Sequence, residues 1–65
     1  MSQCRTVLKH LTENDHLTSM QAVLVYRIPR LASRIYDLRR AGHKIVSLPA
    51  FDANGQEYTR YQLAA

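Results

Sequence analysis

The sequence predicts an α+β fold of three helices followed by a β-hairpin, formed as a single domain over residues 1–65. Two observations predict this order. Apolar residues recur at helical spacing in three segments before Gly42. After Gly42 the pattern changes to short β-branched and aromatic runs around an Asn-Gly pair. A chain of 65 residues has room for one small core and no large active-site cleft.

The first helix is expected from about Gln3 to Leu11. Ser2 is a suitable N-cap, and the turn-forming stretch "TENDH" at 12–16 ends the helix. One stripe carries its apolar side chains at i, i+3, i+4 and i+7, namely Cys4, Val7, Leu8 and Leu11.

The second helix is expected to start after Thr18, because Thr18 and Gln21 have the spacing of a capping box. Leu17 stands just before this cap, where it can pack against Ala22 as a hydrophobic staple. The helix runs through "MQAVLVY" to about Tyr26 and is apolar all round. That composition predicts a helix sandwiched between other elements.

The third helix is expected from about Pro29 to Ala41. Pro29 suits a first helical turn, and Gly42 suits the left-handed position after a helix end. Arg39 and Arg40 fall in the last turn, where cations meet the negative end of the helix dipole. A narrow stripe of Leu31, Ile35 and Leu38 forms its core face.

Two strands are expected at 43–49 and 57–63, joined by the loop "DANGQ". Pro49 marks either the end of the first strand or an exposed edge. In the second strand Thr59, Tyr61 and Leu63 share the face expected to point to the core. The side chains expected to be buried in the whole domain are Leu8, Leu11, Val23, Leu31, Ile35, Leu38, Ile45 and Leu63.

The charge pattern indicates a polyanionic partner. Nine Lys or Arg against five Asp or Glu give a net charge of +4, and residues 25–45 hold five arginines against Asp37. Arg30 and Arg34 form a like-charge i, i+4 pair that costs a few tenths of a kcal/mol, so a compensating contact is expected. DNA phosphates or guanine edges supply one. The alternative is a solvated face steadied by Asp37 with Arg34 or Arg40.

The order of helix, capped short helix, Pro-containing turn, arginine-rich helix and hairpin is that of a helix-turn-helix with a wing. The stretch "RLASRIYDLRRAGHKI" with a hairpin ending "YTRYQL" resembles the small winged helix-turn-helix domains of bacteriophage and prophage proteins, over about Val7 to Leu63. The resemblance implies that the third helix is the recognition helix, that Gly42 turns the chain and that Ile45 enters the first wing strand.

On this interpretation the outer face of the third helix contacts bases through Arg30, Ser33, Arg34 and Asp37. Contacts to the DNA backbone are expected from residues on and around that face, namely Arg27, Thr18, Ser19, Tyr36, Arg40, Lys44, Tyr58 and Arg60. Asp52 and Glu57 lie in the wing beside Arg60, which argues against a strongly phosphate-binding wing tip.

The sequence indicates no enzyme, cofactor or metal site. No phosphate-binding loop, acid/base pair or nucleophile motif occurs. His10, His16 and His43 lie in different elements without an i, i+4 partner, so we expect surface or partly buried histidines. Cys4 has no second cysteine to bond with and is expected to pack as a small apolar residue.

No run approaches the roughly 18 apolar residues of a membrane span, and the first residues lack the apolar run of a signal peptide. The expected location is therefore the cytoplasm of a bacterial host cell.

Two function classes remain. The first is a sequence-specific double-stranded DNA-binding protein of a phage or mobile element, acting as a transcriptional regulator or as an excision (recombination directionality) factor. The second is a phage-encoded protein-interaction module or inhibitor that docks a host protein through the arginine face. A homodimer or cooperative array on DNA, and a recombinase or host protein as partner, are compatible with the sequence.

Overall fold

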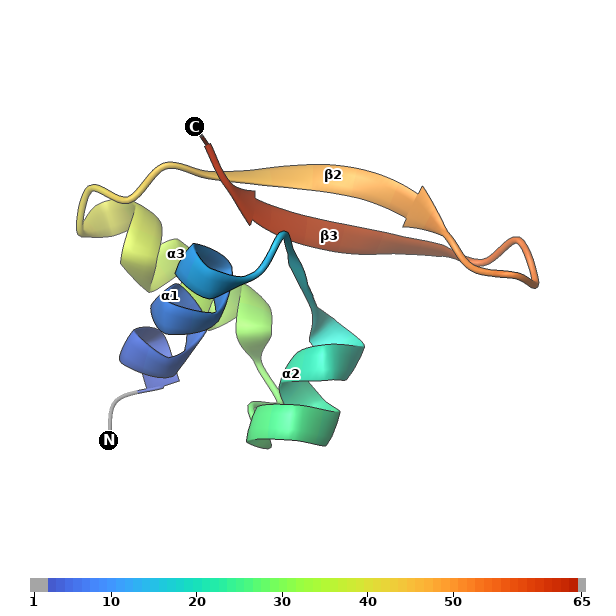
Figure 1. The fold of residues 1–65 in the computed structure, drawn as a ribbon, viewed down its shortest axis with the longest axis horizontal. Coiled ribbons are helices and arrows are strands. Elements are labelled where there is room, and N and C mark those ends of the chain that lie inside the picture. Colours follow the sequence, from blue (N-terminus) through green and yellow to red (C-terminus); the bar gives the residue numbers. More distant parts are fainter. Residues whose placement is uncertain (1–2, 65) are drawn as a thin grey trace.

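The computed structural model describes residues 3–64, which form three helices and three strands. In chain order these are α1 (Gln3–Glu13), β1 (Leu17–Thr18), α2 (Ser19–Tyr26), α3 (Leu31–Arg40), β2 (Ile45–Phe51) and β3 (Glu57–Leu63). The helices gather on one side of the sheet, and the β2–β3 hairpin projects past α2 (Figure 1). The predicted order of three helices and a hairpin is confirmed. Ser2, the expected cap of the first helix, lies outside the described residues.

The sheet has the strand order β1-β3-β2 and is antiparallel throughout. In β1, Leu17 pairs with Tyr61 and Thr18 with Arg60. The sequence does not predict this strand, because two residues show no alternation and both match the start signals of α2. Pairing with β3 fixes the hairpin to the helical part of the domain.

The core lies between the helices and the base of the hairpin. Leu11, Leu31, Ile35, Leu38 and Ile45 are buried as predicted. Leu8 and Leu63 are only half-buried and pack against the core from its edge. Four further residues complete the buried cluster, namely Val7, Leu17, Ala22 and Ile28.

The prediction that α2 is sandwiched between other elements is wrong. In this helix only Ala22 is buried, and Val23, expected in the core, is 45% exposed. Met20, Leu24 and Val25 are still more exposed, at 72%, 74% and 64%. The physical reason is size, since a helix of eight residues packs on a thin domain with one face and no second layer covers it.

The ends of α2 follow the sequence signals. Thr18 and Gln21 form the predicted capping box, and Leu17 and Ala22 of the staple are both buried. Arg27 then adopts φ 57°, an uncommon conformation for a residue with a Cβ, and the N–H of Ile28 donates to the Ala22 carbonyl at 3.0 Å. This turn buries Ile28 and directs the chain into α3.

The other boundaries differ slightly from expectation. Helix α1 continues to Glu13, and α3 runs from Leu31 to Arg40 with Arg30 as N-cap and Ala41 as C-cap. Gly42 has φ 105°, the left-handed conformation expected after the helix end.

Only the base of the β2–β3 hairpin packs against the core, and the rest of the hairpin extends beyond it. Pro49 lies within β2, which is an edge strand, so the edge interpretation is confirmed and the strand-end interpretation is wrong. Tyr61 and Leu63 pack against the core as expected, whereas Thr59 is exposed because it lines the open groove between α2 and the hairpin. No helix within residues 3–64 is long and apolar enough to cross a membrane.

Candidate nucleic-acid interface

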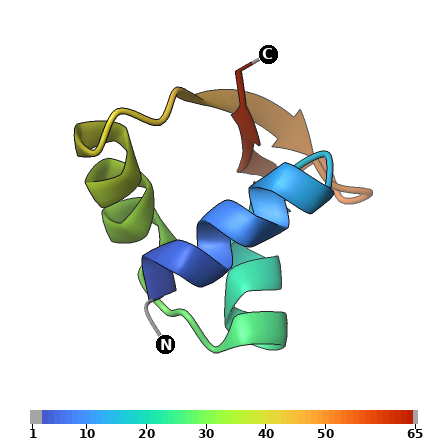
Figure 2. The same cartoon turned by 60° about the vertical axis from the view of Figure 1, so that its left-hand side comes forward.

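Burial of Leu31, Ile35 and Leu38 fixes the orientation of α3, so that its remaining side chains point away from the core. Beside it lies a shallow, largely polar depression of about 570 Å³, with Tyr36 and Pro29 in its lining. The same lining brings together all four side chains predicted to contact bases, namely Arg30, Ser33, Arg34 and Asp37. The helix is seen at the left of Figure 2.

Two residues of this depression form an ion pair. Arg34 Nη2 lies 3.0 Å from Asp37 Oδ2, with the two side chains 33% and 46% exposed. The thiol of Cys4 donates weakly to the same carboxylate at 3.9 Å, and Cys4 is half-buried against the core. The Arg34–Asp37 ion pair that the solvated-face alternative expects is therefore present. The carboxylate of Asp37 offsets the positive charge of Arg34.

Other cations around α3 carry no such partner. Within residues 3–64, Arg27, Arg30 and Lys44 are exposed and form no ion pair, and Arg40 lies 5.9 Å from the centre of the Tyr36 ring as a cation–π contact. These positions extend from the turn before α3 to the loop after it. Unpaired positive charge thus lies at both ends of the helix.

Arg39 serves the fold instead. Its Nε donates to the Ile45 carbonyl at 3.0 Å and its Nη2 to Ser47 Oγ at 2.9 Å. These bonds tie α3 to the first residues of β2, so the Arg39 guanidinium is engaged within the fold although its side chain is exposed.

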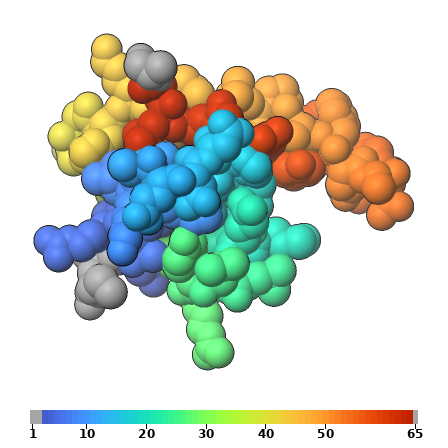
Figure 3. Space-filling model, in the orientation of Figure 1, coloured from blue at the N-terminus to red at the C-terminus, as the bar shows by residue number. Residues whose placement is uncertain are grey.

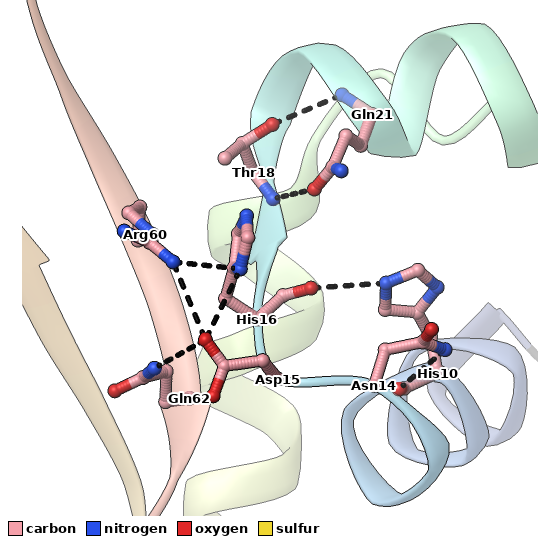
Figure 4. Close-up of polar contacts among 8 residues, drawn as sticks. All are labelled: His10, Asn14, Asp15, His16, Thr18, Gln21, Arg60 and Gln62. Atoms are coloured by element: carbon pink, nitrogen blue, oxygen red, sulfur yellow. Dashed lines mark hydrogen bonds and ion pairs between the residues drawn. The ribbon is translucent and has the colours of Figure 1, made fainter. Parts of the chain in front are cut away.

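Three residues predicted to contact the DNA backbone lie elsewhere. Thr18, Ser19 and Tyr58 line a groove between α2 and the hairpin. The hairpin tip lies at the opposite end of the molecule from the C-terminal end of α3 in both ribbon views (Figures 1 and 2). Thr18 Oγ1 also accepts the Gln21 N–H at 3.2 Å, and Gln21 Oε1 accepts the Thr18 N–H at 3.0 Å (Figure 4).

Arg60, also predicted as a backbone contact, belongs to a polar cluster between β3 and the segment after α1 (Figure 4). Its Nη2 donates to Asp15 Oδ2 at 3.3 Å and to His16 Nδ1 at 2.8 Å. Since a guanidinium has no acceptor, His16 Nδ1 is the acceptor in this hydrogen bond. Gln62 Nε2 donates to the same Asp15 oxygen at 3.3 Å.

A family model described as a winged helix-turn-helix domain matches residues 2–65 of the chain. The chain belongs to the winged helix-turn-helix family. Domains of this family bind DNA, so membership indicates a DNA partner and confirms the fold family indicated by "RLASRIYDLRRAGHKI". Searches of curated proteins and of solved structures found no significant match.

The wing of this winged helix-turn-helix domain is the β2–β3 hairpin, and its tip carries no cation. From Pro49 to Thr59 there is no Lys or Arg, while Asp52 and Glu57 are acidic. Asp52 Oδ1 accepts the N–H groups of Asn54 and Gln56, each at 2.9 Å, so this carboxylate shapes the loop. The exposed Phe51 adds an aromatic ring rather than a charge.

The His10 side chain links helices of the domain. His10 Nε2 donates to the His16 carbonyl at 3.0 Å, and in the neutral ring Nδ1 then accepts from the Tyr26 hydroxyl at 2.6 Å. This ring links α1 to α2 and to the start of β1. Within residues 3–64 no group of three or more His, Cys, Asp or Glu gathers as metal ligands would.

Proposed function

We propose that this protein binds double-stranded DNA sequence-specifically, with α3 in the major groove. The observation that carries the proposal is the unpaired positive charge at both ends of α3, from Arg27 and Arg30 before it and from Arg40 and Lys44 at its end. Ten residues of helix span about 15 Å, and the major groove is about 12 Å wide. The two cationic ends therefore match the two phosphate backbones that border the groove.

Base reading is assigned to the depression beside α3. Arg30 is exposed and unpaired, so its guanidinium is free to bond guanine O6 and N7 in bidentate fashion. Ser33, Arg34 and Asp37 line the same depression. Tyr36, 59% exposed, lies between the two cationic ends, where its ring and hydroxyl suit a sugar or phosphate contact.

The proposed biological role is that of a passive, non-catalytic DNA binder in a bacterial host cell, either a transcriptional regulator or an excision factor of a phage or mobile element. The phage part rests on the resemblance of the α3 and hairpin sequences to such domains. Both roles use the same DNA contacts. Neighbouring genes distinguish them, because an adjacent integrase gene supports excision and an adjacent repressor gene supports regulation.

One observation favours a second function. The wing tip is acidic and exposes Phe51 and Tyr58, a surface that suits a protein better than a phosphate backbone. A protein-interaction module or inhibitor that docks a host protein is therefore the competing proposal. In that case the arginines of α3 would meet an acidic protein surface.

Fluorescence anisotropy on random and on selected duplexes, over a series of salt concentrations, tests the proposal. DNA binding through several phosphates gives an affinity that falls steeply with salt, and selection from a random library yields a preferred site. If neither duplex binds at low salt, DNA is not the partner and the protein-docking function takes its place.

A further inference from the structure

The groove between α2 and the wing is a mainly apolar hollow on the surface of residues 3–64. It encloses about 650 Å³, and its apolar lining comes from Met20 and Leu24 of α2 and from Tyr58 and Tyr61 of β3. Figure 3 shows the hollow between α2 and the projecting hairpin. Among its lining residues Asp52 alone is acidic, and none is Lys or Arg.

One wall of this groove is also an exposed ridge. Met20 and Leu24 are one helical turn apart and point away from the buried Ala22, so most of each side chain meets solvent. The whole segment 17–26 contains no charged residue. Large apolar side chains gathered in this way on a small domain mark an interaction site.

We propose that a second copy of this chain docks here, with the α2 ridge of each copy in the α2–wing groove of the other. A two-fold interface needs a self-complementary surface, and a ridge lying directly beside a groove supplies one. The two hydrophobic side chains Met20 and Leu24 then meet Tyr58 and Tyr61 of the other copy.

The charge distribution favours this face over the basic faces for a contact between two copies. Each copy carries a net charge of +4, so two copies repel each other wherever their basic surfaces approach. The ridge carries no charged residue, and the groove is lined by no Lys or Arg, so approach through this face avoids that repulsion.

Pairing through the sheet edge is less suitable. Strand β2 is an edge strand, yet Pro49 in its middle has no N–H to donate. The carbonyl of Ile45 is already occupied by Arg39. The edge is thus interrupted at two points, which is how folded proteins prevent edge-to-edge pairing.

A dimer of this kind leaves α3 exposed in both copies, since the groove and the depression beside α3 share no lining residue. Two exposed recognition helices related by a two-fold axis would suit a two-fold symmetric DNA site. The dimer itself goes beyond the proposed function and does not depend on it, because no DNA contact holds it together.

The domain has a small surface, and this sets the conditions of the test. A standard interface covers about 800 Å² on each partner, which is roughly a sixth of the 4867 Å² surface of this domain. Because that is a large share of so small a surface, we expect a weak dimer that forms at protein concentrations of up to about 1 mM.

Sedimentation equilibrium of the full chain without DNA tests the proposal. The parent protein should pass from 7.5 kDa towards twice that mass as its concentration rises to about 1 mM. Leu24→Asp should remain monomeric throughout, because it places a carboxylate in the apolar groove of the other copy. Circular dichroism should show unchanged folding, since Leu24 is 74% exposed.

Val25→Asp is the matched control, because Val25 is also exposed on α2 but lies on the flank near α1, outside the groove. It should dimerise like the parent. A parent protein that stays monomeric at about 1 mM overturns the proposal. So does an equal effect of both substitutions, or an effect of neither. Duplex binding measured on the same samples is a separate readout, whose failure would remove the proposed function and leave the dimer result intact.

Discussion

Arg34 and Asp37 are joined across one turn of α3 by a 3.0 Å ion pair at the edge of the predicted base-contacting surface. The pair relieves the repulsion between Arg30 and Arg34, since Asp37 offsets one of the two charges. Arg30 is left as the unpaired cation of the depression. The two arginines, equivalent in the sequence pattern, are therefore in different electrostatic states.

Arg30→Ala should lower the affinity for the preferred duplex by about 1–3 kcal/mol, the value of a bidentate arginine–guanine contact. The fold should be unaffected, because Arg30 is exposed and makes no side-chain cap of α3. Fluorescence anisotropy measures the reduced affinity. Arg5→Ala, which removes an exposed cation of α1 outside the depression, is the control and should change binding far less.

A double-mutant cycle on Arg34 and Asp37 separates the solvated-face interpretation from DNA contact. Both side chains are substantially exposed, so solvent screening limits their coupling in the free energy of unfolding to about 0.2–0.5 kcal/mol. Urea denaturation measures that coupling. If the arginine contacts DNA, Arg34→Ala also weakens duplex binding. Unchanged binding with intact coupling would leave the pair a feature of a solvated surface.

How far the sequence predicted the fold depended on how local each signal was. The capping box of Thr18 and Gln21 and the turn at Gly42 were found, because neighbouring residues determine them. The exposure of Val23 and the pairing of Leu17 with Tyr61 were not, because they depend on what lies across the domain. No local sequence pattern shows that the outer face of α2 is covered by no other element of the domain.

In the candidate site, too, features set by neighbouring residues were predicted and features set by distant residues were not. Helical periodicity correctly placed Arg30, Ser33, Arg34 and Asp37 beside one another. The partners of Arg60 could not be found in this way, since Asp15 and His16 are more than 40 residues away. Arg39 resembles its neighbour Arg40 in the sequence, but the start of β2 engages its guanidinium. Side chains of one residue type therefore acquire different roles from distant contacts.

Leu38→Ala should lower the free energy of unfolding by about 2–5 kcal/mol, because Leu38 is 5% exposed and its removal leaves a cavity in the core. A small domain has little stability beyond that, so the variant should be largely unfolded at about 37 °C. Thermal melting followed by circular dichroism measures this. Leu48→Ala, at an exposed position of β2, serves as the matched leucine control and should melt close to the parent.

Thr18→Ala should cost about 0.5–2 kcal/mol of folding free energy, because it leaves the Gln21 N–H without its side-chain acceptor. Thr18→Ser retains the hydroxyl and should recover most of that stability. Urea denaturation of the three proteins measures the effect. If the serine variant is as unstable as the alanine variant, the methyl group of the half-buried threonine, rather than the cap, stabilises this turn.

The salt dependence of duplex binding distinguishes Arg40 from Arg60. Each phosphate that a cation neutralises adds about 0.9 to the slope of log affinity against log salt, so Arg40→Ala should reduce the slope by about that amount. Arg60→Ala should reduce it less, because Asp15 already offsets the charge of Arg60 within the fold. Asp15→Asn in the same series removes that offset. An Arg60→Ala slope change as large as that of Arg40→Ala would mean that Arg60 leaves Asp15 to bind a phosphate, and the wing would then lie against the DNA backbone.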